Sequence, residues 1–175
     1  IIKEANTLAR FIRREKSGGN SIGFVPTMGA IHQGHLDLIG QSRREAGYTV
    51  CSIFVNPTQF NNIGDFRKYP QVIEKDITQL VTAGTDILFL PSIEAVYTGG
   101  TSQLETYDLG YLETVLEGKY RPGHFQGVCQ VMKRLITMVQ PDQLFMGLKD
   151  YQQCMVVKRL LAIMQSPVQF VACAT

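Results

Sequence analysis

Short runs of apolar residues alternate along the chain with longer segments in which apolar positions recur every three or four residues. The short runs are typical of β-strands buried on both faces, and the longer spacing is typical of amphipathic helices. The pattern predicts five strands, at residues 21–25, 49–55, 85–91, 143–147 and 168–174, and five helices, at residues 1–16, 35–47, 71–84, 125–140 and 150–164.

Apolar strands that alternate with helices indicate an α/β fold, in which helices cover both faces of a parallel sheet. Crossovers between parallel strands are nearly always right-handed, so few ways of winding the sheet remain. The simplest is a doubly wound sheet with strand order 3-2-1-4-5 and a ligand crevice between the first and fourth strands. We therefore expect a functional site lined by the loops that follow Val25 and Met146.

Other segments are less regular. Residues 56–70 are polar and rich in turn-forming residues, so they are predicted to form a loop. The stretch 92–124 is predicted to contain a helical piece at Ile93–Tyr97 and a strand near Gln103–Leu109. Gly47 is expected to end the second helix, as glycine commonly does.

Composition narrows the class of protein. Of the 175 residues, 45% are hydrophobic and 18% are charged, which suits one globular domain better than a disordered tail or a coiled coil. Seventeen basic and fifteen acidic residues give 17 − 15 = +2, too little charge to indicate nucleic acid or an anionic membrane as a partner. No apolar run approaches the roughly 18 residues of a transmembrane helix, and the charged start does not resemble a secretory signal. We expect a soluble, cytoplasmic protein.

The four cysteines, Cys51, Cys129, Cys154 and Cys173, lie far apart and form no C-x-x-C pair. This spacing argues against both a disulfide framework and a zinc ribbon. Because each cysteine has apolar neighbours, all four are predicted to be small buried side chains.

The loop after the first strand, P-T-M-G-A-I-H-Q-G-H at residues 26–35, is the most distinctive motif. Gly29 and Gly34 remove side chains where the backbone must turn or a ligand must approach closely. The helix that starts near Gly34 presents free amides and the positive end of its dipole, which suits a phosphate. His32 and His35 are expected to project toward that phosphate. The motif is neither a Walker A loop nor a G-x-G-x-x-G fingerprint.

Two other interpretations of this loop stay open. Two of the three histidines could share a loop by chance. An H-x-x-H metal site would need a third ligand, and the motif supplies only Asp37. The loop favours phosphate chemistry without a metal bound by the protein.

The loop after the fourth strand repeats this logic. Gly147 ends the strand, Lys149 stands at the start of the next helix, and Asp150 can cap that helix. The plain alternative is a helix cap beside a solvated lysine. Because the strand order places the two loops opposite each other, Lys149 is predicted to clamp a phosphate.

Further polar residues extend the candidate site. Asn56 and Gln59 follow the second strand and Gln153 follows the fourth, and amide side chains suit the hydroxyl and carboxylate groups of a small polar substrate. Arg121 and His124 lie in a loop before the long helix. Taken singly, Gln59 and Gln153 fit surface positions better, whereas Arg121 and His124 fit loop scaffolding equally well.

Together these motifs resemble the pantoate–β-alanine ligase family. H-x-G-H alone is shared across the nucleotidyltransferase superfamily, whereas residues 52–60 and 121–125 are much more specific to this family. The matches run in order from Gly23 to Gln153, which is nearly the whole chain. They read PTMGAIHQGHLDLI, SIFVNPTQF, YP, EGKYRPGHFQGV, MVQPD and GLKDYQQ.

The resemblance implies a Rossmann-like domain that joins ATP and pantoate into pantoyl adenylate, after which β-alanine displaces AMP to give pantothenate. It also implies Mg²⁺ with the ATP and a homodimer. His35 would be the catalytic proton donor, as a protonated imidazole, and His32 its partner. The resemblance assigns ATP to Met28, Gly29, Ala30, Ile31, His32, Gln33, Gly34, His35, Gly147, Leu148, Lys149 and Asp150, and pantoate or β-alanine to Gln59, Gln153, Asn56, Arg121 and His124.

The chain departs from the family pattern in two respects. Leu148 stands where the family usually has an acidic residue. We expect this difference to modify the loop without abolishing ATP binding. Family members continue into a small C-terminal domain that closes over the phosphates, so residues 1–175 are interpreted as the nucleotide-binding N-terminal domain. Two alternatives are a binding or dimerisation domain with little turnover, and a nucleotidyltransferase that makes a dinucleotide.

Overall fold

The computed structural model describes residues 1–60, 62–70, 72–102 and 104–174. Within these residues, five parallel strands form one sheet in the order β3-β2-β1-β4-β5, which confirms the predicted order. The strands are β1 (Ile22–Thr27), β2 (Tyr48–Ile53), β3 (Ile87–Phe89), β4 (Gln143–Gly147) and β5 (Gln169–Cys173). The helices are α1 (Ala5–Ser17), α2 (Gln33–Glu45), α3 (Ile63–Lys68), α4 (Ile73–Thr82), α5 (Ile93–Val96), α6 (Leu116–Tyr120), α7 (His124–Val139) and α8 (Tyr151–Ile163), with 3₁₀ turns η1 (Pro57–Gln59), η2 (Gly110–Glu113) and η3 (Leu148–Asp150).

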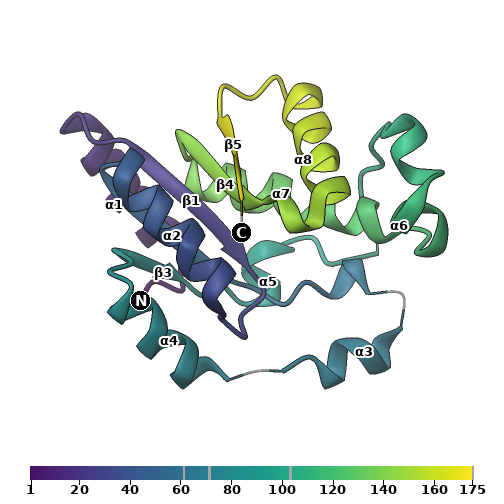
Figure 1. Ribbon diagram of the computed structural model, residues 1–175, viewed down its shortest axis with the longest axis horizontal. Coiled ribbons are helices and arrows are strands. Elements are labelled where there is room, and N and C mark those ends of the chain that lie inside the picture. The colour runs from purple at the N-terminus through teal and green to yellow at the C-terminus, as the bar shows by residue number, and fades with distance from the viewer. Residues whose placement is uncertain (61, 71, 103, 175) are drawn as a thin grey trace.

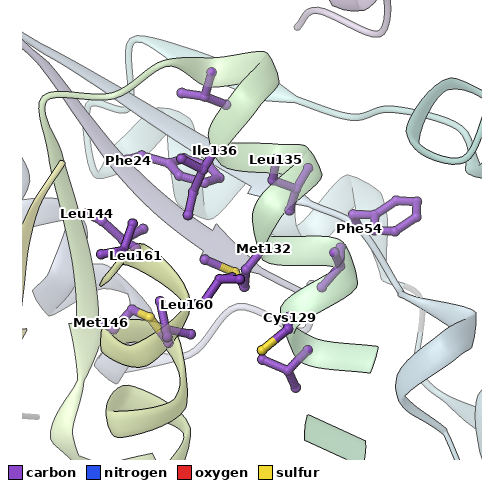
Figure 2. Close-up of a cluster of buried hydrophobic side chains, with 14 of the residues drawn as sticks. Phe24, Phe54, Cys129, Met132, Leu135, Ile136, Leu144, Met146, Leu160 and Leu161 are labelled. Carbon is purple, nitrogen blue, oxygen red and sulfur yellow. The ribbon is translucent and has the colours of Figure 1, made fainter. Parts of the chain in front are cut away.

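Helices cover both faces of the sheet, with α2 in front of it and α7 behind it in Figure 1. Side chains alternate between the faces along a strand, so Phe24 joins one core and Val25 joins the other. The first core is completed by α1, α7 and α8, and the second by α2 and α4. Figure 2 shows part of the first core, in which side chains of α7 lie against those of β4 and α8.

The crevice opens where β1 and β4 separate. Their last pair joins Phe24 and Leu144, whereas β1 stays paired with β2 as far as Thr27. Pro26 therefore lies inside β1, although a proline has no N–H for a ladder. Its backbone nitrogen faces the side of β4, as that of Ile22 does. At this position β4 is no longer paired with β1, so no hydrogen bond is lost. The prediction that this strand stops at residue 25 is wrong for that reason.

The prediction of a helix over residues 1–16 is wrong at its start. Ile2 is extended beside β3, where its backbone bonds to Leu88 and Leu90, and α1 begins at Ala5. The second helix ends at Glu45, with Ala46 rather than Gly47 as its C-terminal cap.

The irregular stretches also differ from the prediction. The loop predicted for residues 56–70 contains η1 and the short helix α3. The described residues 104–109 form no strand, and Gln103 lies outside the described residues, as does Gln71 at the predicted start of the third helix. The predicted helical piece at Ile93–Tyr97 is confirmed as α5.

All four cysteines are buried and free, as predicted. Among the described residues, none of the helices is both long and apolar enough to span a membrane.

Candidate active site

A cleft of about 290 Å³ lies between the carboxyl ends of β1 and β4. It brings together the loops that follow the first and fourth strands, as the strand order predicts. The predicted site residues that line it are Met28, His32, Gly34, His35, Gln59, Gly147, Lys149, Asp150 and Gln153.

His32 and His35 stand at the start of α2, where their rings stack with centroids 3.9 Å apart. The backbone N–H of His32 donates to Nδ1 of His35 over 3.4 Å. Because Nδ1 accepts, the proton of the neutral His35 ring is on Nε2. Nε2 is therefore the nitrogen of His35 that can donate to a ligand.

Burial lowers the pKa of His35 to about 4, and His32 and Lys149 act in the same direction while Asp76 opposes them. The ring is therefore neutral at neutral pH in the free protein, and a protonated His35 beside bound ATP stays a prediction. An anion bound beside the ring would raise its pKa again. The free site thus offers a neutral N–H donor.

The turn between β1 and α2 has its amides turned toward the protein. Gly29 N–H donates to Thr27 Oγ1 at 3.2 Å. The N–H groups of Ala30 and Ile31 donate to the Asp76 carboxylate at 2.9 and 2.8 Å. The first N–H groups of a helix have no partner within the helix, so the start of α2 is the part of this loop that keeps amides for a phosphate.

On the opposite side of the cleft, Gly147 ends β4 and η3 leads into α8. Lys149 and Asp150 line the cleft, while Leu148 is 38% exposed and lies outside its lining. Asp150 occupies the N-cap position of α8, but its side chain makes no capping hydrogen bond. The predicted capping role is therefore wrong, and this carboxylate is left at the cleft.

Gln59 is held in one orientation by buried neighbours. Asn56 Nδ2 donates to Gln59 Oε1 at 3.1 Å and to the carbonyl of Gly127 at 3.0 Å. Because Oε1 accepts this bond, Nε2 is the donor that Gln59 turns toward Met28, and it donates to Met28 Sδ at 2.9 Å. His124 Nδ1 donates to the Gln59 carbonyl at 2.9 Å, and burial lowers the pKa of its ring. Asn56 and His124 thus support Gln59 from outside the cleft lining.

Two predicted residues point elsewhere. Arg121 forms an ion pair with Glu117 at 3.0 Å on an exposed surface, and Gln33 Nε2 donates to Asp37 at 2.8 Å. Their contacts with substrate remain predictions. Across the described ranges, no group of three or more His, Cys, Asp or Glu side chains could hold a metal ion.

Sequence reasoning missed two features of the site. Val128, Val131, Met132 and Leu135 of α7 form an apolar wall of the cleft, yet their spacing is that of any amphipathic helix. Asp76, which is 1% exposed, was also missed. A signal for it existed, because this carboxylate falls on the apolar stripe of the predicted helix 71–84.

The parallel sheet, its switch-point cleft and the paired histidines at a helix start define a doubly wound α/β domain that carries an H-x-G-H motif beside its cleft. A family model described as pantoate-beta-alanine ligase matches residues 1–175. The chain therefore belongs to the pantoate–β-alanine ligase family.

Relatives and solved structures agree. Pantothenate synthetase of Porphyromonas gingivalis is 42% identical over 173 residues, which cover 99% of this chain and 61% of that protein. Pantothenate synthetase from Thermus thermophilus has a TM-score of 0.90 and 41% identity, over 99% of this chain and 61% of that one. Pantoate-beta-alanine ligase from Francisella tularensis, complexed with Beta-gamma ATP and Beta-alanine, has a TM-score of 0.93 and 39% identity. The match covers 99% of this chain and 66% of that one. The chain thus spans 61% of the length of the first two.

Proposed function

We propose that this chain carries the ATP and pantoate sites of an enzyme that makes pantothenate from pantoate, β-alanine and ATP. The observation that carries the proposal is the cleft itself, which gathers a histidine pair, a lysine, two amides and an apolar wall at the switch point of the sheet. The complex of the Francisella tularensis relative with Beta-gamma ATP and Beta-alanine supports it.

The proposed reaction has two steps. A carboxylate oxygen of pantoate attacks the α-phosphorus of ATP, and the bond from that phosphorus to the bridging oxygen breaks to release pyrophosphate. The amine of β-alanine then attacks the acyl carbon of pantoyl adenylate, loses a proton, and displaces AMP. Because both reactants are bound and aligned, no protein nucleophile is needed.

Negative charge grows on the phosphoryl oxygens and on pyrophosphate during the first step. His35 Nε2–H, Lys149 and the N-terminal amides of α2 surround the cleft from two sides. Donors that are fixed before the reaction stabilise such charge without reorganising. We assign these groups to the phosphates and keep His32 as the neighbour that orients His35.

Pantoate carries a carboxylate and two hydroxyl groups, and it also has two methyl groups that share one carbon. Gln59 Nε2 is placed to donate to one of its oxygens, and Gln153 offers a second amide at the cleft. The apolar wall of α7 suits the methyl groups. This division predicts that polar and apolar parts of pantoate are recognised by different elements.

Mg²⁺ is proposed to accompany ATP. Asp150 is the one carboxylate among the described residues that line the cleft. Mg²⁺ prefers oxygen ligands and keeps several waters, so phosphate oxygens, water and Asp150 would hold it. When bound, it would neutralise part of the phosphate charge.

We also propose that residues 1–175 act as the nucleotide-binding domain of a longer, cytoplasmic, homodimeric enzyme. Its relatives are longer, and the resemblance implies that a C-terminal segment closes over the phosphates. An open site leaves water around the α-phosphate, so the 175-residue chain should bind ATP weakly and turn over slowly.

The test is β-alanine-dependent AMP release by the 175-residue chain and by a chain extended to the length of its relatives. Release that needs both pantoate and β-alanine, and that is much faster in the extended chain, supports the proposal. Binding without turnover in both forms favours a binding module, and a dinucleotide product favours another nucleotidyltransferase. Equal rates in the two chains would refute the role proposed for the C-terminal segment. Sedimentation velocity tests the dimer.

A further inference from the structure

The turn that leads into the paired histidines has an unfavourable backbone conformation. Gly29 and Ala30 have φ values of 86° and 51°, both in the left-handed region. Glycine adopts this region freely, whereas a residue with a β-carbon does so at a cost in free energy. Contacts elsewhere in the protein must therefore hold Ala30 in place.

Asp76 supplies those contacts from α4, 46 residues further along the chain. Its Oδ2 accepts from Ala30 N–H at 2.9 Å and its Oδ1 accepts from Ile31 N–H at 2.8 Å. A β-carbon at Gly29 would lie 3.0 Å from Oδ2, so the carboxylate packs directly against the turn. Both oxygens are thus committed to the backbone of this loop.

The same carboxylate acts on the histidine chemistry through its charge. Among the neighbours of His35, His32 and Lys149 lower the pKa of the ring and Asp76 raises it. Burying a carboxylate is costly unless hydrogen bonds compensate, and here two amides do so. The residue therefore joins a strained turn, two backbone amides and a histidine of the cleft.

We propose that Asp76 is a positioning residue of the site, which holds the Gly29–Ile31 turn so that His32 and His35 face the cleft. This role rests on the function proposed above. Asp76 acts through the turn, because it is 1% exposed and is not part of the lining of the cleft. An amide in its place would keep one acceptor, lose the second and remove the charge.

The test replaces Asp76 by Asn and records the imidazole signals of the three histidines by NMR, together with calorimetric titrations of ATP and pantoate. Asp86→Asn is the matched control, because Asp86 also accepts a backbone N–H, from Thr49 at 2.8 Å, but away from the cleft. We expect Asp76→Asn to shift the His32 and His35 signals, leave His124 unchanged, and weaken ATP about 10- to 100-fold, as for the loss of a charged acceptor. Pantoate affinity should stay within about twofold, as for a site that is not touched.

Two further measurements protect the test against a variant that fails to fold. In the unmodified protein, the amides of Ala30 and Ile31 should exchange with deuterium as slowly as helix amides, and ATP should slow Gln33 and Gly34 instead. Ala30→Gly, which relieves the left-handed strain, should restore part of the ATP affinity in the Asp76→Asn background.

Unchanged His32 and His35 signals in Asp76→Asn, or fast exchange at Ala30 and Ile31, would overturn the positioning role. An equal response to Asp86→Asn would overturn it too, since the effect would then be a general loss of stability. If the unmodified protein failed to bind ATP, the proposed function would be wrong, while the histidine signals would still decide whether Asp76 positions the turn.

Discussion

Replacing Gly127 by alanine tests how strongly the cleft depends on the contact between α7 and η1. A β-carbon at this position would lie 2.3 Å from the carbonyl oxygen of Thr58 and 2.6 Å from Cα of Gln59. Both neighbours are backbone atoms, so neither can rotate away. The turn η1 must therefore move, and Gln59, which presents Nε2 to the cleft, must move with it.

Two effects oppose each other in this variant. Glycine to alanine inside a helix ordinarily stabilises a protein by about 1 kcal/mol. Overpacking against neighbours that cannot yield costs about 1–3 kcal/mol or more. Because the contacts are so short, overpacking should prevail, and we expect the free energy of unfolding to fall by about 1–2 kcal/mol. A displaced Gln59 should also weaken pantoate binding by about 1–3 kcal/mol.

Urea denaturation and calorimetric titration with pantoate measure the two effects. Gly40→Ala in α2 is the control, because a β-carbon there meets its nearest neighbour, Arg44, at 3.5 Å, which is ordinary contact. That variant should gain about 0.5–1 kcal/mol of stability and bind pantoate normally. The reasoning fails if Gly127→Ala resists urea as well as Gly40→Ala does and binds pantoate like the parent.

Three other outcomes are expected. Gln59→Ala should weaken pantoate by about 1–3 kcal/mol and spare ATP in separate titrations; equal loss of both would indicate misfolding, and unchanged pantoate affinity would refute the contact. The free energy of unfolding should fall as the pH drops from about 6.5 to about 4. In this range the unfolded chain protonates its histidine, with a pKa of about 6.5, whereas folded His35, with a pKa of about 4, stays neutral. Urea melts across this range should fall less steeply for His35→Gln, and an identical slope would contradict the lowered pKa. Because burial raises the pKa of Cys51, Cys129, Cys154 and Cys173, native protein should react slowly with iodoacetamide and unfolded protein quickly; rapid labelling of the native state would disprove their burial.

The strand order could be predicted because buried strands and amphipathic helices leave different periodicities, and right-handed crossovers restrict the winding. The residues at which helices and strands begin and end were harder to predict. Pro26 is typical of the end of a strand. Its missing N–H matters only where a neighbouring strand would accept a hydrogen bond, and at this position β4 is no longer paired with β1. Ile2 fits the helical spacing of the residues that follow it. Its actual partner, β3, lies far away in the sequence, so the local pattern gives no sign of it.

The same limit applies to the site. His35 and Lys149 could be placed together because both follow strands that flank the switch point. The protonation of His35 could not be predicted, since it depends on burial and on charges from three elements. The resemblance assigns Asn56 and His124 to the substrate, and the structure shows that both hydrogen-bond to Gln59. Separating a residue that touches a ligand from one that supports it requires tertiary contacts.

Exchange of labelled pyrophosphate into ATP tests the central claim most directly, because it requires formation of the adenylate but not β-alanine. The measurement compares the protein with its His35→Ala variant, in the 175-residue chain and in a chain extended to the length of its relatives. We expect exchange to depend on pantoate and to fall about 10²- to 10³-fold in His35→Ala, since one preorganised donor is removed, while ATP affinity changes less. Exchange without pantoate, or a His35→Ala rate within a few-fold of the parent, would contradict the account.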